Sequence, residues 1–172
     1  HPRISHYNRL VTGTAGQTRR VAEQNNGFVW VSELDTELGG ETRNAVAVSS
    51  IDLAGILSLA GDRPIALAKV DIEGSEFAFF EAASDDEIQR VEQFTIEFHD
   101  FLDPALTPAV EAVRKRFEKL GYRWLKFTRH TNGGVLAIRE DCLPSGWYPM
   151  YLIEKYGRGL LRIFRRAVGI AT

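Results

Sequence analysis

From residue 50 onward, apolar runs that suit buried strands alternate with segments whose apolar residues recur at helical spacing. The clearest strands are Ile65–Val70 and Phe94–Phe98, and the clearest helix is Thr107–Leu120, which opens on the capping hydroxyl of Thr107. Strands that are separated by helices pair in parallel through right-handed crossovers. The alternation therefore predicts an α/β fold with a mostly parallel sheet.

The two ends of this pattern differ from its centre. Strands at Tyr122–Phe127 and Val135–Ile138 flank the sequence Asn-Gly-Gly, which is a hairpin signal. We expect this hairpin to add one antiparallel strand to the sheet. Before the alternation begins, residues 1–48 carry strand patterns such as Ile4–Thr12 without helical ones, and Ser50 then supplies an N-cap for a short helix.

The sequence divides into a domain over residues 1–149 and a C-terminal segment over residues 150–172. The domain comprises a β-rich segment over residues 1–48 and an α/β core over residues 49–140. In the C-terminal segment five basic residues outnumber one acidic residue, and apolar residues recur at helical spacing: Leu152, Tyr156, Leu160, Phe164 and Val168. The segment is therefore predicted to form a basic amphipathic helix, which can lie on an anionic membrane surface, on a partner or on its own domain.

The composition is that of a globular protein, with 172 residues of which 44% are hydrophobic and 26% are charged. No apolar run approaches the length that spans a bilayer, and the lone Cys142 rules out an internal disulfide and suits a reducing compartment. Between Asp71 and Asp103 eleven residues are acidic and one is basic, which argues against nucleic acid as a ligand because phosphate binding needs the opposite charge. We expect a cytoplasmic protein that can also associate with a membrane.

Polar side chains follow the two central strands where each strand ends. Asp71 and Glu73 come after the first strand, and Glu97 and His99 come at the end of the second. Open α/β sheets collect ligands at such strand ends, where these groups could orient a hydroxyl, remove its proton or hold a divalent cation. In the alternative interpretation, Lys69 pairs with Asp71 or Glu97 and His99 is inert. We favour a site, because gathering like charges is costly without a ligand.

The octapeptide Lys69–Glu76 resembles the Lys-hydrophobic-Asp-hydrophobic-Glu-Gly-x-Glu signature of the FkbM family of S-adenosylmethionine-dependent O-methyltransferases. Two flanking segments, Val48–Leu53 and Ile96–His99, are also similar to segments of that family. The resemblance extends over residues 46–140. It implies a Rossmann-like class I methyltransferase sheet, whose reversed final hairpin matches the predicted one.

The resemblance also implies a reaction, the transfer of a methyl group from S-adenosylmethionine to a hydroxyl of a small molecule or glycan, such as a sugar or a polyketide. It carries over His99, Asp71 and Glu97 as catalytic residues and Glu73 and Gly74 as substrate-binding residues. His99 is the preferred base, because a neutral imidazole titrates near physiological pH. A divalent cation could serve instead of the imidazole, although we expect no metal.

The family's donor-binding elements do not match this sequence. In the family, a strand that ends in an Asp-x-Gly-type loop and an acidic residue on the next strand hold the methyl donor, and no segment here resembles either. We therefore expect the chain to be the C-terminal portion of the domain, without the domain's N-terminal strands and inactive alone. A bare sheet edge would then favour a homo-oligomer.

Two other functions are compatible with the same residues. One is a non-catalytic α/β binding or docking module that engages a membrane surface or a partner through its basic tail. The other is a carboxylate-based hydrolase that uses Asp71 or Glu73 together with Glu97.

Overall fold

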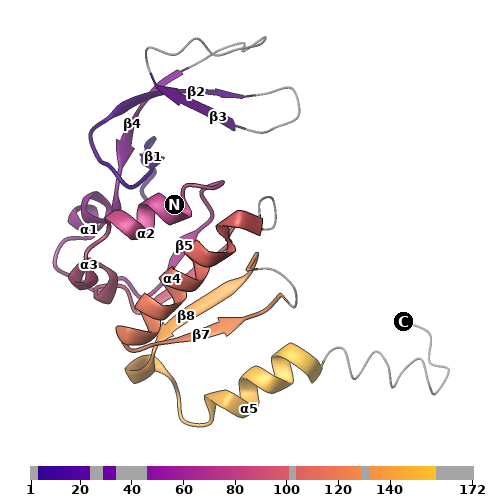
Figure 1. Ribbon diagram of the computed structural model, residues 1–172. Coiled ribbons are helices and arrows are strands. Elements are labelled where there is room, and N and C mark those ends of the chain that lie inside the picture. The colour runs from indigo at the N-terminus through magenta and orange to yellow at the C-terminus, as the bar shows by residue number, and fades with distance from the viewer. Residues whose placement is uncertain (1–3, 24–28, 34–45, 101–103, 129–131, 158–172) are drawn as a thin grey trace, which may run out of the picture.

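The computed structural model describes residues 4–23, 29–33, 46–100, 104–128 and 132–157, which form two four-stranded sheets with helices beside them (Figure 1). The strands, in chain order, are β1 (Leu10–Val11), β2 (Thr18–Glu23), β3 (Val29–Glu33), β4 (Val46–Ile51), β5 (Ala68–Val70), β6 (Gln93–Ile96), β7 (Tyr122–Lys126) and β8 (Val135–Arg139). The fold class is therefore α/β, as the sequence predicts.

The first sheet has the strand order β1-β4-β2-β3. β1 pairs in parallel with β4, whereas β2 pairs antiparallel with both β4 and β3. The predicted strand over Ile4–Thr12 is wrong in length, because only Leu10–Val11 pairs with a neighbour. The strand Thr18–Glu23 is not predicted, since it has polar residues at both ends and no sustained apolar alternation.

Helix α1 (Leu53–Ala60) follows β4 directly, and its N-cap is Asp52 rather than the predicted Ser50. The Asp52 carboxylate accepts a hydrogen bond from the Gly55 N–H at 2.9 Å. Ser50 lies within β4, and its hydroxyl donates to the Thr14 carbonyl at 2.6 Å. β4 runs three residues past the β-rich segment over residues 1–48, and its bond to Thr14 holds Ser50 against the turn that follows β1.

The second sheet carries the polar strand ends and has the order β5-β6-β8-β7. β5 and β6 pair in parallel, with Val70 opposite Ile96. β8 pairs antiparallel with both β6 and β7. The two central strands are therefore neighbours, and the final hairpin enters the sheet in the reversed direction, both as predicted.

Both sheets are mixed among the described residues, so a mostly parallel Rossmann-like sheet is not confirmed, although β5, β6 and β7 run in the same direction and β8 is reversed. The parallel pairs are β1–β4 and β5–β6, and the other four pairs are antiparallel. β5 and β6 are joined through residues 71–92, and β6 is joined to β7, which runs in the same direction, through the segment over residues 97–121, which contains a helix. β7 and β8 follow each other directly as a hairpin.

The crossover between β5 and β6 consists of α2 (Glu76–Ala82) and α3 (Asp85–Gln89). A capping box between Ser84 and Glu87 opens α3, as the sequence predicts. After β6, a 3₁₀ turn (Pro104–Leu106) leads into α4 (Thr107–Lys119). The N-cap of α4 is Leu106, so the prediction that Thr107 caps the helix is wrong.

A hydrophobic core lies between the second sheet and the helices α2 and α4. It is built from aromatic rings in edge contact: Phe80 lies 5.3 Å and Phe94 5.4 Å from Phe117, centroid to centroid. Tyr122 also packs against Phe117, and its hydroxyl donates to the Ile88 carbonyl at 2.7 Å. Burial raises the pKa of Tyr122 to about 12. The core thus fixes the crossover helices onto the strands that carry the polar residues.

After β8, a 3₁₀ turn (Glu140–Cys142) precedes α5 (Trp147–Leu152), which continues as a π-helical turn (Ile153–Gly157). In Figure 1 α5 lies beside β7. The Tyr151 ring packs 5.9 Å from that of Phe127, and Lys155 Nζ donates to the Lys126 carbonyl at 2.7 Å. The rest of the predicted amphipathic stripe, from Leu160 onward, lies outside the described residues.

Several large hydrophobic side chains of this C-terminal helix are more than half exposed: Tyr148, Met150, Ile153 and Tyr156. Tyr156 belongs to the stripe that was expected to pack, so only part of that stripe faces the domain. Within the described ranges, no helix combines the length and the apolar character that crossing a bilayer requires.

Candidate functional site

The end of β5 turns sharply into α2, and this turn carries the signature residues. Glu73 has a φ of 52° and Gly74 a φ of 95°, so two successive residues adopt left-handed backbone conformations. Such a conformation is ordinary for glycine but uncommon for glutamate. A Cβ atom at Gly74 would meet no atom of the described residues within 4 Å, which leaves room beside the backbone there.

The end of β6 lies beside this turn. The Glu97 N–H donates to the Val70 carbonyl at 3.0 Å, which extends the parallel pairing one residue past the end of β6. His99 follows two residues later and is only 8% exposed. The parallel register therefore brings the imidazole to the turn between β5 and α2.

Three of the predicted site residues come together here. Asp71, Glu73 and His99 each present one oxygen or nitrogen atom, and these atoms all lie within 4.8 Å of one another. Glu73 Oε2 lies 3.3 Å from His99 Nε2. We call these three residues together with Glu76 the His99 cluster. Its first three members offer the mixed oxygen and nitrogen ligands that a divalent cation could take.

Glu97 is not among the groups that converge. Its side chain contributes attraction to Lys69, whose ammonium donates to Asp71 Oδ2 at 2.6 Å. The hydrogen bond and the charge of Asp71 raise the pKa of Lys69. The alternative interpretation of the sequence is thus partly realised, because Lys69 does pair with Asp71, yet Asp71 also faces His99.

Glu76 is the fourth member of the cluster, and the sequence-based prediction missed it. Its side chain is fully buried, and Oε1 lies 3.0 Å from His99 Nδ1. The Ile72 N–H donates to the same oxygen at 3.2 Å. Helical spacing gave a usable signal that Glu76 is buried. It stands three and four residues before Phe79 and Phe80, which are both buried, and so lies on the same face of the helix.

A second buried polar group supports the loop that follows His99. Asp100 Oδ2 accepts a hydrogen bond from Asn132 Nδ2 at 2.6 Å, and Asp100 Oδ1 accepts one from the Asn132 N–H at 3.3 Å. Both residues are 5% exposed. This pair ties the end of β6 to the hairpin between β7 and β8, and it therefore limits how far His99 can move.

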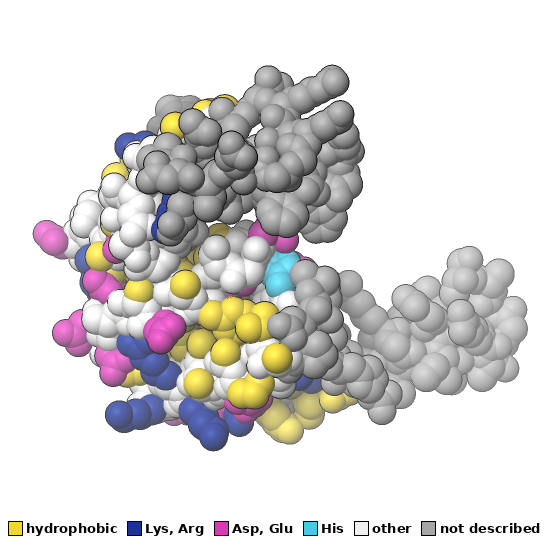
Figure 2. Space-filling view, turned by 45° about the horizontal axis from the view of Figure 1, so that its top comes forward, with side chains coloured by type: hydrophobic (Ala, Val, Ile, Leu, Met, Phe, Trp, Pro, Cys, Tyr) yellow, Lys and Arg dark blue, Asp and Glu magenta, His cyan; other side chains and the backbone are white. Residues whose placement is uncertain are grey.

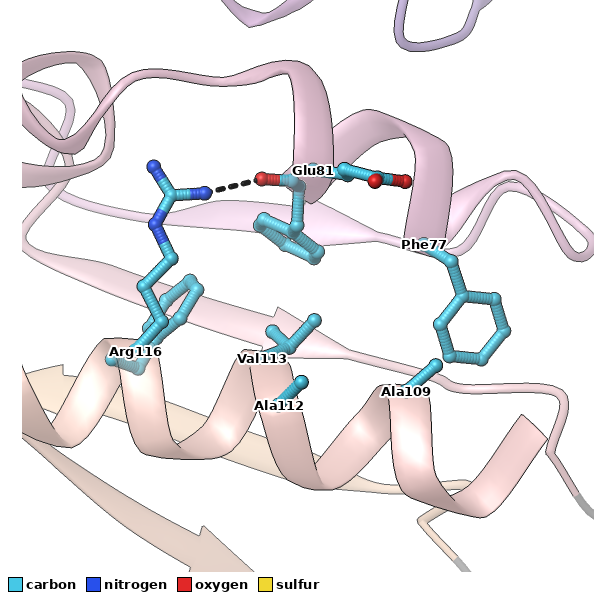
Figure 3. A pocket seen from close by; sticks show the side chains of 8 residues that line it. Phe77, Glu81, Ala109, Ala112, Val113 and Arg116 are labelled. Carbon is cyan, nitrogen blue, oxygen red and sulfur yellow. Dashed lines mark hydrogen bonds between the residues drawn. The ribbon is translucent and has the colours of Figure 1, made fainter.

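A shallow groove lies between α2 and α4 and has a volume of about 330 Å³ (Figure 3). Its lining is mainly apolar and includes Phe77, Ala109 and Val113, while Arg116 closes one end by donating to the Phe80 carbonyl at 2.7 Å. None of the predicted site residues lines it. On the face shown in Figure 2, hydrophobic side chains gather at the centre, and Lys and Arg side chains collect below them.

The arrangement suits proton transfer better than nucleophilic attack. A protonated imidazole can donate to Glu76 and Glu73 at once, whereas a neutral imidazole can donate to only one of them. One carboxylate, Glu76, is enclosed by the core, and the other, Glu73, has a side chain that is 66% exposed. A buried carboxylate behind an imidazole that faces an exposed position is the pattern of a positioned general base.

Comparisons with known proteins give a family match, which covers most of the chain. The family model of the methyltransferase FkbM domain matches residues 2–124, which is more than half of the chain. That range contains the whole of the His99 cluster. No curated protein and no solved structure matches the chain.

Proposed function

Because the chain belongs to the methyltransferase FkbM family, we propose that it forms the acceptor side of an O-methyltransferase, in which the His99 cluster binds and deprotonates a hydroxyl group. The observation that carries this proposal is the pair of contacts on the imidazole, with Glu76 at Nδ1 and Glu73 at Nε2. The acceptor is a hydroxyl of a small molecule or glycan, of the sugar or polyketide type.

The position of Glu73 indicates where the acceptor oxygen would lie. Glu73 Oε2 is 3.3 Å from His99 Nε2, within hydrogen-bonding reach of the imidazole. The Glu73 side chain is 66% exposed, so it can swing aside and let a hydroxyl oxygen take that place. His99 Nε2 would then be placed to take the hydroxyl proton, while a bound methyl donor would supply the methyl group and leave as the thioether.

The other predicted site residues would bind and orient the acceptor. Asp71 lies within the cluster and can accept a hydrogen bond from a second hydroxyl of a sugar-like acceptor. The open backbone at Gly74 permits close approach. Glu97 lies at the same sheet edge and acts on Lys69, so its part in the reaction would be indirect.

S-adenosylmethionine, when bound, supplies the methyl group as an electrophile. The residues of this chain do not fit a complete site for it, since no segment matches the family's donor loop. Within the described residues β5 also pairs on one side only, with β6. Parallel sheets are usually covered on both faces, and an exposed edge strand leaves backbone N–H and C=O groups unpaired. We therefore propose that donor-binding strands beyond these 172 residues pair with β5.

Calorimetric titration with S-adenosylmethionine tests whether the donor site lies outside these 172 residues. We expect no saturable binding by the 172-residue chain and clear binding by a form extended at its N-terminus. Tight binding by the 172-residue chain would overturn the proposal that the donor strands lie elsewhere. Absence of binding by the extended form would overturn the proposed activity itself.

The exposed face of α5 favours a second role, in docking. Tyr148, Met150 and Ile153 are 55%, 61% and 66% exposed, and the segment from Met150 to the end carries five basic residues. Exposed aromatic and aliphatic side chains that are followed in the sequence by basic ones suit an anionic lipid surface. We propose that this helix binds the surface of such a membrane.

Sedimentation with vesicles tests the docking role. We expect the chain to bind vesicles that contain phosphatidylserine but not vesicles of phosphatidylcholine alone. Ile153→Ser should weaken binding about 30-fold, because one buried aliphatic side chain contributes about 2 kcal/mol. Leu59→Ser is the matched control, since Leu59 is an exposed apolar residue of α1. Equal binding by both variants, or a dimer in light scattering without vesicle binding, would overturn the proposal.

A further inference from the structure

We propose that Glu76 is the positioning residue of His99: it holds a proton on Nδ1, so that the basic electron pair of the neutral imidazole lies on Nε2, toward Glu73. The consequence for methyl transfer rests on the proposed function, but the protonation pattern does not.

The first observation is where Glu76 lies. It is the first residue of α2, and its side chain is fully buried beside Phe79 and Phe80. An ionisable side chain is rarely buried in this way unless it is paired. His99 is the ionisable partner that meets it, with 3.0 Å between Glu76 Oε1 and His99 Nδ1.

The second observation fixes the direction of the hydrogen bond. Glu76 Oε1 also accepts a hydrogen bond from the Ile72 N–H at 3.2 Å, and a backbone N–H can only donate. Because an ionised carboxylate can only accept, Oε1 of ionised Glu76 also accepts from His99. It follows that Nδ1 carries the proton, and that in the neutral imidazole Nε2 is the basic nitrogen.

The third observation is the other oxygen of the same carboxylate. Glu76 Oε2 is buried and has no hydrogen-bond partner among the described residues. A glutamine would satisfy the contact at Oε1 equally well, so a hydrogen bond alone does not explain the buried charge. A negative charge at this position stabilises the imidazolium that forms when His99 accepts a proton, and this is the second effect that we assign to Glu76.

The protonation pattern can be measured directly on the 172-residue chain by ¹⁵N NMR of the imidazole, at a pH where His99 is neutral. We expect the proton of His99 to lie on Nδ1 in the wild-type chain and to move to Nε2 in Glu76→Leu. The control is Glu81→Leu, which removes an exposed carboxylate from the same helix and should leave the proton on Nδ1. A proton on Nε2 in the wild-type chain, or no change in Glu76→Leu, would overturn the proposal.

A second variant keeps the proposal testable if Glu76→Leu does not fold. Glu76→Gln can still accept from Nδ1, so we expect the proton to stay on Nδ1 while the charge is lost. In the extended, active form this variant should lower kcat about 10- to 100-fold with an unchanged KM. An unchanged kcat would overturn the role of the charge. If the NMR result holds and no hydroxyl is methylated, the proposed function fails while the assignment of Glu76 stands.

Discussion

Glu76 Oε1 and His99 Nδ1 lie 3.0 Å apart although 23 residues separate them in the chain. The contact joins the first turn of α2 to the loop after β6, and the parallel pairing of β5 with β6 makes it possible. A change that shifts the pairing of β5 with β6 should therefore separate Glu76 from His99, even where the domain remains folded. The predictions below concern the packing, the backbone strain and the chemistry that depend on this arrangement.

The turn after β1 packs directly against α2 at Gly13. A Cβ atom at this position would lie 2.8 Å from the Ala78 carbonyl carbon and 3.2 Å from Ala82 Cβ. Because backbone atoms cannot give way cheaply, Gly13→Ala should lower the free energy of unfolding by about 3 kcal/mol, as measured by urea denaturation. Gly134→Ala is the control, since its nearest contact would be an ordinary 3.6 Å to Thr128. Equal stability of the two variants would contradict this packing.

Glu73 carries a strained backbone at the mouth of the site. Its φ of 52° is uncommon for a residue with a side chain, so Glu73→Gly should raise the free energy of unfolding by about 1 kcal/mol. Glu73→Gln keeps the strain and should leave stability within about 0.5 kcal/mol of the wild type. Thermal unfolding of the two variants checks this. A Glu73→Gly variant that is less stable than the wild type would show that the side chain stabilises the turn.

Tyr122 should make the protein sensitive to alkaline pH. Burial raises the pKa of its phenol from 10.0 to about 12, so the folded state holds this proton more tightly than the unfolded state does. This contribution to stability is fully present below pH 10 and is lost as the pH rises through about 12, to a total of about 2 kcal/mol. Tyr122→Phe should remove this part of the pH dependence and, by deleting the bond to Ile88, cost about 1 kcal/mol at neutral pH.

Denaturation of wild type and Tyr122→Phe at pH 7 and pH 11 separates the two effects. The stability difference between them should shrink as the pH rises. If the free energy of unfolding changes with pH in the same way for both proteins, the Tyr122 phenol does not cause the loss of stability at alkaline pH.

The sequence predicted the elements whose signals are local. The two central strands and the final hairpin were predicted from neighbouring residues, and the capping box at Ser84 has its sequence signature within four residues. The mixed first sheet was not predicted, because β2 lacks apolar alternation and owes its strand conformation to its partners β3 and β4. Propensity is a weak guide where pairing decides the conformation.

The candidate site was also predictable in part, because some of its residues follow directly from local strand signals. The ends of two neighbouring strands gave Asp71, Glu73 and His99, since the chain order alone places them at one edge of the sheet. Glu97 was placed with them by alternation along the strand, but its side chain acts on Lys69 and is not among the groups that converge. Glu76 was missed because a glutamate in a first helical turn is ordinarily a solvated residue that complements the helix dipole.

The central claim is that His99 accepts the proton of a hydroxyl that becomes methylated. The most direct test is the initial rate of methyl transfer from labelled S-adenosylmethionine to a panel of sugars and polyketide alcohols, with the N-terminally extended protein. The wild type should label at least one hydroxyl, His99→Gln should be about 100- to 10,000-fold slower, and the exposed His6→Gln control should be unchanged. A His99→Gln variant that transfers methyl groups at the wild-type rate would contradict the account.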